Sequence, residues 1–421
     1  MTVLIYEPNA AGHRFHYVSL LAAGLQEIGV RPLLATTRGA LQSDHFATHL
    51  SEICHQKCPS GKDVSLEVFE VDKRASQFDL GEGKRFSEAI KSVCPEHLFV
   101  PTASQFTAAL GKYFLLRKSF GKPGMGAEGI HTGPGYAYPV SLSQKLKNRS
   151  CMEIERRLPW TKYGHIDPFQ LNAIRGRFGS SSKYQVTPDP APTPPKLTKQ
   201  QVRSHFGIPE DGSYLGCMAT ISVSKGILEL LAAFSRAQKR MEDTDRLLLL
   251  GKFEPELFKL IQNRYPTLLE EQRIICIDRH LSEYDMNIAA LAFDFVCAAH
   301  RIARPGSSGV ILRAAAAGIP VLTGDQFWQG TIVPRFKLGW TCKVLDEEDF
   351  SNALISSLSD CRKYRPSETS ERFAKFHSEE NFKAHWTELI RRKLGIGPAP
   401  KKLTWEWVLD NQPLELNREN Y

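Results

Sequence analysis

Short apolar runs alternate with amphipathic stretches through the second half of the chain. Five runs have the length of buried strands: Tyr214–Thr220, Arg246–Leu250, Ile274–Ile277, Asp294–Ala298 and Ile319–Leu322. The stretches between them place apolar residues at helical spacing, as in ILELLAAFSRAQ. This alternation is typical of a parallel sheet covered by helices on both faces. We therefore predict an α/β fold whose ligands bind at the carboxyl ends of the strands.

The N-terminal half begins with the same pattern. Thr2–Tyr6 is a predicted strand and Tyr17–Ile28 a predicted helix, joined by the polar turn EPNAAGHRFH. Within that turn, Gly12 lets the backbone pass close to a ligand, and His13 and Arg14 offer hydrogen-bonding groups. A plain structural turn is the alternative.

A proline-rich stretch divides the chain. Residues 188–195 read PDPAPTPP, which predicts a stiff extended linker rather than helix or sheet. A chain of 421 residues also exceeds what one hydrophobic core usually supports. We predict an N-terminal Rossmann-like domain over residues 1–190, a second one over 191–368, a helix crossing back over 369–395 and a tail over 396–421.

The predicted last helix, Phe373–Leu394, places apolar residues on one side: Phe376, Phe382, Trp386, Leu389 and Ile390. Its length is sufficient to reach back to the first domain. The tail carries Trp405 and Trp407, so we expect it to dock on the protein.

One glycine-serine turn is the clearest candidate for chemistry. Gly306, Ser307, Ser308 and Gly309 lead into an alanine-rich predicted helix that ends at Gly318. The start of a helix presents N–H groups without intrahelical partners and the positive end of its dipole, which suits a phosphate. The alternative is a core helix of any α/β protein.

As an ordered set, these elements resemble the nucleotide-binding half of retaining glycosyltransferases with the GT-B fold, most closely family four. The match runs in order through Lys225-Gly226, Leu247–Gly251, His280-Leu281-Ser282, Asp294 and Ala314–Val321. It covers residues 201–360 well and the N-terminal half more loosely. The resemblance implies two doubly wound domains with a cleft between them, the first on the acceptor side and the second binding the nucleotide sugar.

The chain departs from the family pattern at three positions. Pro305 and Arg313 stand where the family has two glutamates, and Thr220 stands where it has an arginine. In the family the second glutamate holds the ribose hydroxyls, and an arginine is a donor only, so it cannot replace that acceptor. Arg313 could instead bind a phosphate or an acidic sugar. A degenerate, inactive member of the family is the alternative.

The resemblance also implies roles for individual residues. Lys225 would neutralise the diphosphate, and His131, which follows a predicted strand, would face the donor sugar; a structural histidine is the alternative. With Arg313 these two form the candidate catalytic set, and fixed positive charge on the departing diphosphate would be the main catalytic contribution. The candidate donor-binding residues are Gly12, His13, Arg14, Thr220, Gly251, His280, Leu281, Gly306, Ser307, Ser308 and Gly309.

Two groups of residues invite a metal interpretation, and we reject both. Asp243-Thr244-Asp245 has the letters of a metal-binding pair, but it precedes a predicted strand and so lies at the wrong end for a ligand; we predict a solvated turn. Cys54 and Cys58, with three histidines nearby (His45, His49 and His55), match no tight ligand spacing. We expect no metal and no cofactor, with a nucleotide sugar as the donor substrate.

Positive charge is concentrated in one segment. Between Lys112 and Lys183 there are 13 Lys and Arg against 4 Asp and Glu, a net charge of +9, whereas the whole chain carries +8. Such an excess predicts an anionic partner, either the inner leaflet of a membrane or a pyrophosphate-linked lipid acceptor. A solvated basic face without a partner is the alternative. No recognition motif supports nucleic acid.

Cysteine usage and hydropathy predict the compartment. Nine cysteines without a framework fit a reducing cytoplasm. No signal peptide is recognisable, and no window reaches the roughly eighteen apolar residues of a membrane span. We expect a cytoplasmic protein, with peripheral attachment to the inner face of the membrane as an open possibility.

These observations predict a hexosyltransferase-type glycosyltransferase that moves a sugar from a nucleotide sugar to a polysaccharide or lipid-linked acceptor in envelope or exopolysaccharide synthesis. Retention of configuration is implied by the resemblance alone. A non-catalytic, nucleotide-sugar-binding partner protein and a nucleotide-sugar 2-epimerase share the fold and remain as alternatives.

Overall fold

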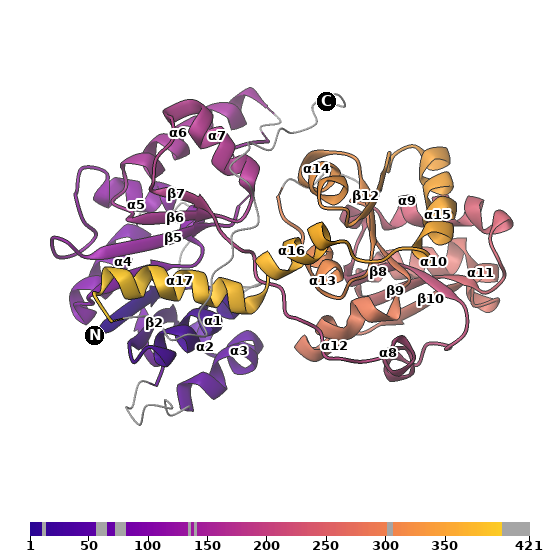
Figure 1. Cartoon of the computed structure of the whole chain (residues 1–421), viewed down its shortest axis with the longest axis horizontal. Coiled ribbons are helices and arrows are strands. Elements are labelled where there is room, and N and C mark those ends of the chain that lie inside the picture. Colours follow the sequence, from indigo (N-terminus) through magenta and orange to yellow (C-terminus); the bar gives the residue numbers. More distant parts are fainter. Residues whose placement is uncertain are drawn as a thin grey trace. The chain divides into compact units, whose positions relative to one another are not determined.

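The computed structural model describes residues 1–10, 14–55, 65–71, 81–133, 136–138, 141–300 and 306–397. The described chain forms two compact units (Figure 1), the first containing Met1–Pro188 and residues 379–397, and the second containing Asp189–Ser378. Gly12, His13, Cys58, Pro305 and residues 398–421 of the predicted tail lie outside the described residues.

The first unit is built on a parallel seven-stranded sheet of order β3-β2-β1-β4-β5-β6-β7. Its strands are β1 (Thr2–Tyr6), β2 (Arg31–Thr37), β3 (Glu67–Val71), β4 (His97–Val100), β5 (Gly126–His131), β6 (Lys162–His165) and β7 (Tyr184–Val186). The order reverses between β1 and β4, so this sheet is doubly wound and has its switch point there.

The helices of the first unit include two groups whose members contact one another, one around α1 (Arg14–Glu27) and one around α5 (Thr107–Phe114). The other helices are α2 (Arg38–Leu41), α3 (Asp44–His55), α4 (Gly81–Val93), α6 (Leu142–Arg157), α7 (Pro168–Phe178) and α17 (Glu379–Lys393). Helix α1 contacts both α3 and α17, whereas α5 contacts α4 and α6. Trp386 of α17 lies fully buried, with its ring centroid 5.0 Å from that of Phe99 in β4 and the two rings edge to face, so α17 completes the core of the first unit.

The second unit is built on a parallel six-stranded sheet of order β10-β9-β8-β11-β12-β13. Its strands are β8 (Ser213–Ile221), β9 (Asp245–Phe253), β10 (Ile274–Asp278), β11 (Phe295–Ala298), β12 (Val321–Gly324) and β13 (Gly339–Cys342). All five strands predicted in this half are therefore present. The chain order reverses between β8 and β11, which makes the second sheet doubly wound as well.

Amphipathic helices flank the second sheet. They are α8 (Lys199–Phe206), α9 (Ile227–Ala237), α10 (Pro255–Arg264), α11 (Pro266–Glu270), α12 (Glu283–Ile288), α13 (Gly309–Ala316), α14 (Phe327–Arg335), α15 (Glu347–Cys361) and α16 (Glu368–Phe376). In α9 the residues Ile227, Leu230, Leu231 and Phe234 are all fully buried or within one per cent of it. Their i, i+3, i+4, i+7 spacing gives α9 one apolar stripe, which joins the core below the sheet.

Two helix boundaries differ from the prediction. Helix α1 begins at Arg14, three residues earlier than the polar turn suggested. The predicted single helix Phe373–Leu394 is two helices, because α16 ends at Phe376 and α17 begins at Glu379. Between them the chain pairs with the linker, since the N–H of Ala191 donates to the His377 carbonyl at 2.7 Å.

In the described part of the chain, no helix is long and apolar enough to cross a membrane.

Candidate functional site

A buried carboxylate lies at the carboxyl end of β1, directly after the strand. Glu7 is fully buried, and its two oxygens accept hydrogen bonds from the Thr102 hydroxyl at 2.6 Å and from the N–H of Asn9 at 3.2 Å. Arg14 donates to the same carboxylate at 3.3 Å and to the Gln105 amide oxygen at 2.5 Å. Burial raises the pKa of the Glu7 carboxyl, against the opposing effect of Arg14. Glu7 thus fixes Arg14 where the first turn leaves the sheet.

His131 is the last residue of β5 and only 4 % exposed. Its Nδ1 lies 3.2 Å from a carboxylate oxygen of Glu155, a fully buried residue of α6. The Tyr136 hydroxyl donates to the same oxygen at 2.8 Å. Because the carboxylate can only accept, it favours a proton on Nδ1 and leaves Nε2 as the acceptor in neutral His131.

A second buried histidine stacks on the first. The rings of His131 and His165 have centroids 5.0 Å apart, and His165 Nε2 lies 3.7 Å from the other Glu155 oxygen. Burial lowers the pKa of His165 well below its usual value, so it is neutral at pH 7. Glu155 is therefore shared by neighbours on β5 and β6 and orients the candidate catalytic histidine.

In the second unit, the loop after β8 holds Lys225. The residues Val223–Lys225 form a 3₁₀ turn that ends at Gly226, whose φ of 72° is left-handed, and α9 starts directly after it. Lys225 is half-buried, and Thr220, near the end of β8, is exposed. Both lie at the carboxyl edge of the sheet, where α/β proteins bind ligands.

Gly251 has a structural reason for being glycine. It pairs with Ala219 across β9 and β8, and its φ is 145°. A Cβ at this position would overlap the Ala219 carbonyl oxygen. Ala219 itself has a φ of 82°, a conformation that is costly for a residue with a Cβ. The sheet is therefore strained just before the loop that carries Lys225.

The glycine-serine turn lies after β11, the neighbour of β8 in the sheet. Gly306 has a φ of 103°, and Ser308 is the N-cap residue of α13, although its side chain makes no capping hydrogen bond. The first N–H groups of α13 have no intrahelical partners. Ser307 is fixed differently, because its hydroxyl donates to the Asp189 carboxylate in the linker at 2.6 Å.

Arg313, the candidate phosphate or acidic-sugar ligand, has an acidic partner within the protein. It lies in α13, is 7 % exposed, and its Nη2 is 3.4 Å from an oxygen of Glu283 at the start of α12. A carboxylate thirty residues away therefore balances its charge.

The loop after β10 offers few side-chain groups that could bind a donor. His280 is exposed, whereas Leu281 is 7 % exposed and packs into the protein. The hydroxyl of Ser282 then caps α12 by accepting from the N–H of Asp285 at 3.0 Å. A leucine side chain cannot bind a phosphate, so Leu281 could serve donor binding only through its backbone.

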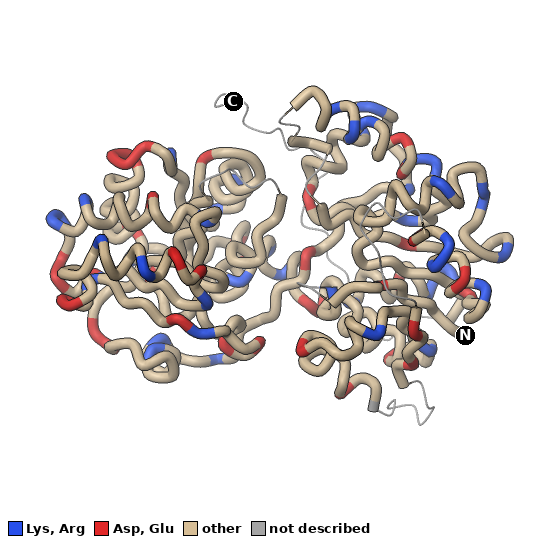
Figure 2. Tube along the Cα trace, turned by 180° about the vertical axis from the view of Figure 1, so that it is seen from behind, with Lys and Arg blue, Asp and Glu red and all other residues tan. Residues whose placement is uncertain are grey.

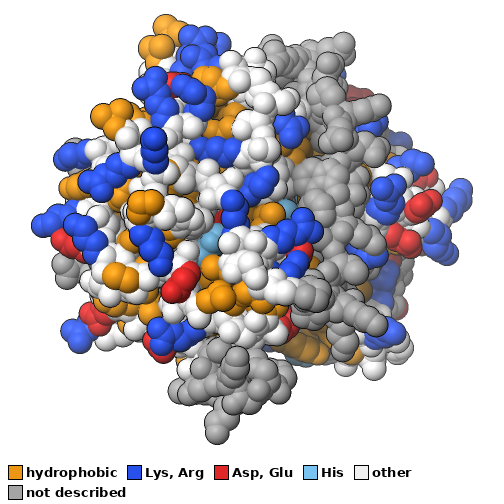
Figure 3. Space-filling model, turned by 60° about the vertical axis from the view of Figure 1, so that its left-hand side comes forward, with side chains coloured by type: hydrophobic (Ala, Val, Ile, Leu, Met, Phe, Trp, Pro, Cys, Tyr) orange, Lys and Arg blue, Asp and Glu red, His pale blue; other side chains and the backbone are white. Residues whose placement is uncertain are grey.

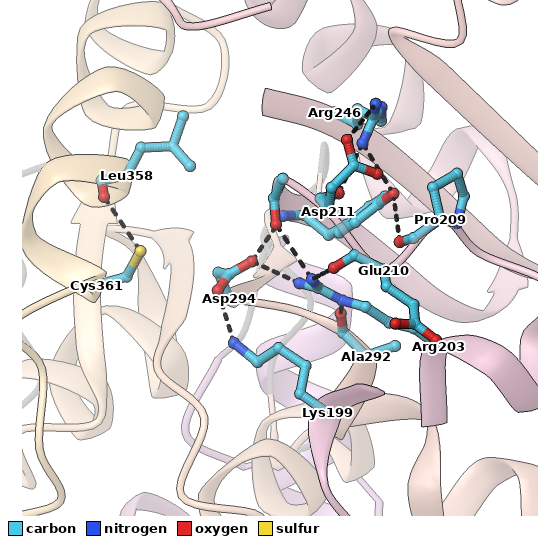
Figure 4. A network of polar contacts seen from close by, with 12 residues as sticks. Lys199, Arg203, Pro209, Glu210, Asp211, Arg246, Ala292, Asp294, Leu358 and Cys361 are labelled. Carbon is cyan, nitrogen blue, oxygen red and sulfur yellow. Dashed lines mark hydrogen bonds and ion pairs between the residues drawn. The ribbon is translucent and has the colours of Figure 1, made fainter. Parts of the chain in front are cut away.

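Asp294 lies at the opposite, amino-terminal edge of the sheet, directly before β11 (Figure 4). Its carboxylate accepts from Lys199 Nζ at 2.6 Å, Arg203 Nη2 at 2.9 Å and the N–H of Tyr214 at 2.7 Å. The Arg203 guanidinium also lies 4.4 Å from the Tyr214 ring centroid. This network joins α8 to the starts of β8 and β11, so the Asp294 position of the family pattern is structural here.

The Asp243–Asp245 segment is also at the amino-terminal side of its strand. Asp243 is exposed and pairs with Arg273 at 3.1 Å, whereas Asp245 is 3 % exposed. Burial raises the pKa of Asp245. The prediction of a solvated turn is therefore wrong for Asp245, which is part of the protein interior. Among the described residues, no three His, Cys, Asp or Glu side chains gather in a metal-binding arrangement.

The sequence analysis did not identify three residues that make the contacts above: Glu7, Glu155 and Asp189. Glu7 could have been identified, because a charged residue directly after an apolar strand falls at the ligand edge of a parallel sheet. Glu155 lies in a basic helix and Asp189 in a proline-rich linker, and neither has a local pattern that would single it out.

No family model matches the chain, and no curated protein matches it in sequence. Solved structures do match it. Anabaena Alr3699/HepE in complex with UDP-glucose has a TM-score of 0.65 at 13% identity, covering 93% of this chain and 100% of the other. Sucrose-phosphate synthase from Thermosynechococcus elongatus has a TM-score of 0.66 at 15% identity, covering 94% and 100%. WaaG, a glycosyltransferase involved in lipopolysaccharide biosynthesis, has a TM-score of 0.60 at 15% identity, covering 93% and 99%.

At these identities the likeness is one of fold, and it extends over nearly the whole chain. Together with the two doubly wound parallel sheets, it shows that the protein has the GT-B fold. The predicted fold class is confirmed.

Proposed function

We propose that the protein is a glycosyltransferase that moves a sugar from a nucleotide sugar to a polysaccharide or lipid-linked acceptor. The observation that carries the proposal is the pair of loops at the carboxyl edge of the second sheet. Lys225 follows β8 and the turn Gly306–Gly309 follows the adjacent β11, so a cation and the N-terminus of α13 belong to neighbouring strand ends. Among proteins with the same fold, HepE binds UDP-glucose.

The chemistry of these groups suits a departing nucleoside diphosphate. The ammonium of Lys225 would offset the charge that develops on the leaving oxygen, and the N–H groups at Ser308 and Gly309 would hold phosphate oxygens. In the first unit, His131 and Arg14 would act on the sugar and its acceptor. The Glu155 carboxylate would keep His131 Nε2 free to accept a hydrogen bond from a sugar hydroxyl.

Donor binding is the first test. A calorimetric screen of UDP-, GDP-, ADP- and dTDP-sugars should find at least one ligand, and Lys225→Ala should weaken it by about 1.5–3 kcal/mol, the range for a hydrogen bond to a charged group. Lys239→Ala removes an exposed lysine beyond α9 and serves as the matched control. Equal affinity of wild type and Lys225→Ala for every bound nucleotide would exclude Lys225 from the site.

One observation favours a second candidate, a nucleotide-sugar-binding protein without transferase activity. Where the resembled family has its ribose-binding glutamate, this chain has Arg313, and Glu283 already balances its charge. Binding of a nucleotide sugar without transfer to any acceptor would favour this candidate over a glycosyltransferase. The absence of released, epimerised sugar would favour it over a nucleotide-sugar 2-epimerase.

A further inference from the structure

The basic segment of the first unit is more polarised in three dimensions than its sequence shows. Of its 13 cations, ten are exposed: Lys112, Arg117, Lys118, Lys122, Lys145, Lys147, Arg149, Arg156, Arg157 and Arg177. Of its four carboxylates, Glu128, Glu155 and Asp167 are at most 2 % exposed. Folding therefore places the acidic groups inside and leaves the cations outside. Figure 2 shows where Lys and Arg occur along the backbone of this unit.

The fourth carboxylate of the segment is already neutralised. Glu153 of α6 is bound by Arg156 at 2.8 Å and by Arg157 at 2.6 Å. Lys183 is turned inward instead, because its ammonium donates to the carbonyls of Glu155 and Leu158 at 3.0 and 2.7 Å and so holds the C-terminus of α6. The outward charge is thus carried by the other cations of the segment.

Helix α6 adds apolar side chains to this charge. Leu142 and Leu146 are 73 % and 55 % exposed, so two large apolar side chains of this helix face solvent. They lie one turn apart on the face that also carries Lys145 and Arg149, since positions i, i+3, i+4 and i+7 of a helix point the same way. The adjoining side of the helix is anchored in the unit by Asn148, Met152 and Glu155, which are at most 7 % exposed. Figure 3 looks onto the first unit and shows apolar side chains scattered among many Lys and Arg.

We propose that the outward face of α6, defined by Leu142, Lys145, Leu146 and Arg149, docks on an anionic lipid bilayer. Charge complementarity supports an anionic partner, because ten exposed cations face no unpaired surface carboxylate within the segment. Among anionic partners, the two leucines favour a lipid bilayer. They can insert beneath the lipid head groups while the neighbouring cations remain at head-group level, whereas a nucleic acid backbone offers nothing for them.

Flotation with vesicles tests the proposal directly and needs no nucleotide sugar, so its outcome is separate from that of the proposed function. The full chain should bind vesicles of phosphatidylcholine with about 30% phosphatidylglycerol and not vesicles of phosphatidylcholine alone. Raising the salt from about 0.05 to about 0.5 M should release most of it, because such ionic strength screens charges beyond several ångströms.

Two sets of variants separate the charges from the leucines. The double variant Lys145→Gln, Arg149→Gln should partition about twenty-five-fold more weakly, since each cation near an anionic surface contributes about a fivefold factor. The matched control neutralises two exposed lysines of the second unit, Lys239 and Lys259, and should bind as wild type does.

The double variant Leu142→Ser, Leu146→Ser should weaken vesicle binding at least about tenfold, whereas Leu260→Ser, Leu345→Ser, which removes two exposed leucines of the second unit, should not. Heparin binding should be unchanged by either leucine pair. Vesicle binding that survives the serine pair on α6, or equal partitioning to neutral and anionic vesicles, would overturn the proposal and leave a polyanion or solvent as the partner of these cations.

Discussion

The Asp294 network gives the most demanding stability prediction of this structure. Asp294 is 21 % exposed, and its carboxylate holds Lys199, Arg203 and the N–H of Tyr214 together at the amino-terminal edge of the second sheet. Replacing it by alanine removes three acceptor contacts at once. Asp294 is one of the residues through which the family resemblance runs, so a role in donor binding is the alternative that the test must exclude.

The magnitude follows from what each partner loses. The N–H of Tyr214 would lose its side-chain partner, at about 1–3 kcal/mol, and Arg203, only 5 % exposed, would lose its carboxylate. Arg203 keeps its hydrogen bonds to the carbonyls of Ala292, Glu210 and Gly212, which limits that loss. Lys199 is 40 % exposed and adds at most about 1 kcal/mol. We expect Asp294→Ala to lower the free energy of unfolding by about 3–4 kcal/mol, and Asp294→Asn by about half of that.

Calorimetric melting of the full chain measures this effect. For a unit of this size, 3–4 kcal/mol corresponds to a Tm lower by roughly 6–14 °C. Asp211→Ala is the control, because that exposed carboxylate reaches Arg246 only at 3.5 Å and should change the Tm by less than about 2 °C. A variant Asp294→Ala that melts like wild type but loses nucleotide affinity would refute the structural assignment and return Asp294 to the site.

Three further predictions concern packing, pH and charge. Gly24→Ala should destabilise the first unit by about 1–3 kcal/mol in urea unfolding, because its Cβ would overlap a threonine of α17, whereas Gly39→Ala, with open space around it, should not. Burial lowers the pKa of His385 from 6.5 to about 3, so the free energy of unfolding should fall as the pH drops below about 6.5. His385→Gln should reduce this dependence of stability on pH by up to about 1.4 kcal/mol per pH unit. An unchanged dependence would mean that His385 is not the buried neutral group responsible for it. Arg313→Glu should lower the Tm by placing a second carboxylate against Glu283, and the added change Glu283→Gln should recover part of the loss; no recovery would mean that the pair is not formed.

The sequence by itself determined the parts of this protein that depend on neighbours along the chain. Strand and helix periodicities identified the strands of the second unit, because burial on a sheet or a helix face repeats over a few residues. The Gly306–Gly309 turn before an alanine-rich helix was recognisable for the same reason. The excess of cations between Lys112 and Lys183 needed only counting.

Predictions from local sequence patterns were wrong where a tertiary contact determined the structure instead. The apolar side of Phe373–Leu394 predicted one helix, but His377 accepts the linker N–H of Ala191 through its carbonyl and the helix is interrupted there. Asp245 looked like a surface residue of an acidic turn, although the strand it begins draws it into the interior. In each case the deciding neighbour or layer is distant in sequence.

Only the tertiary structure decided which polar and charged side chains are partners. Glu283 and Arg313 are thirty residues apart and Asp189 and Ser307 are separated by 118, so no spacing rule connects them. Sequence counts each ionisable group equally, whereas desolvation penalises a buried charge and folding retains it only with partners. That is why three of the four carboxylates of the basic segment are buried while ten of its cations are exposed, and why Arg313 has a carboxylate partner that no local pattern indicated.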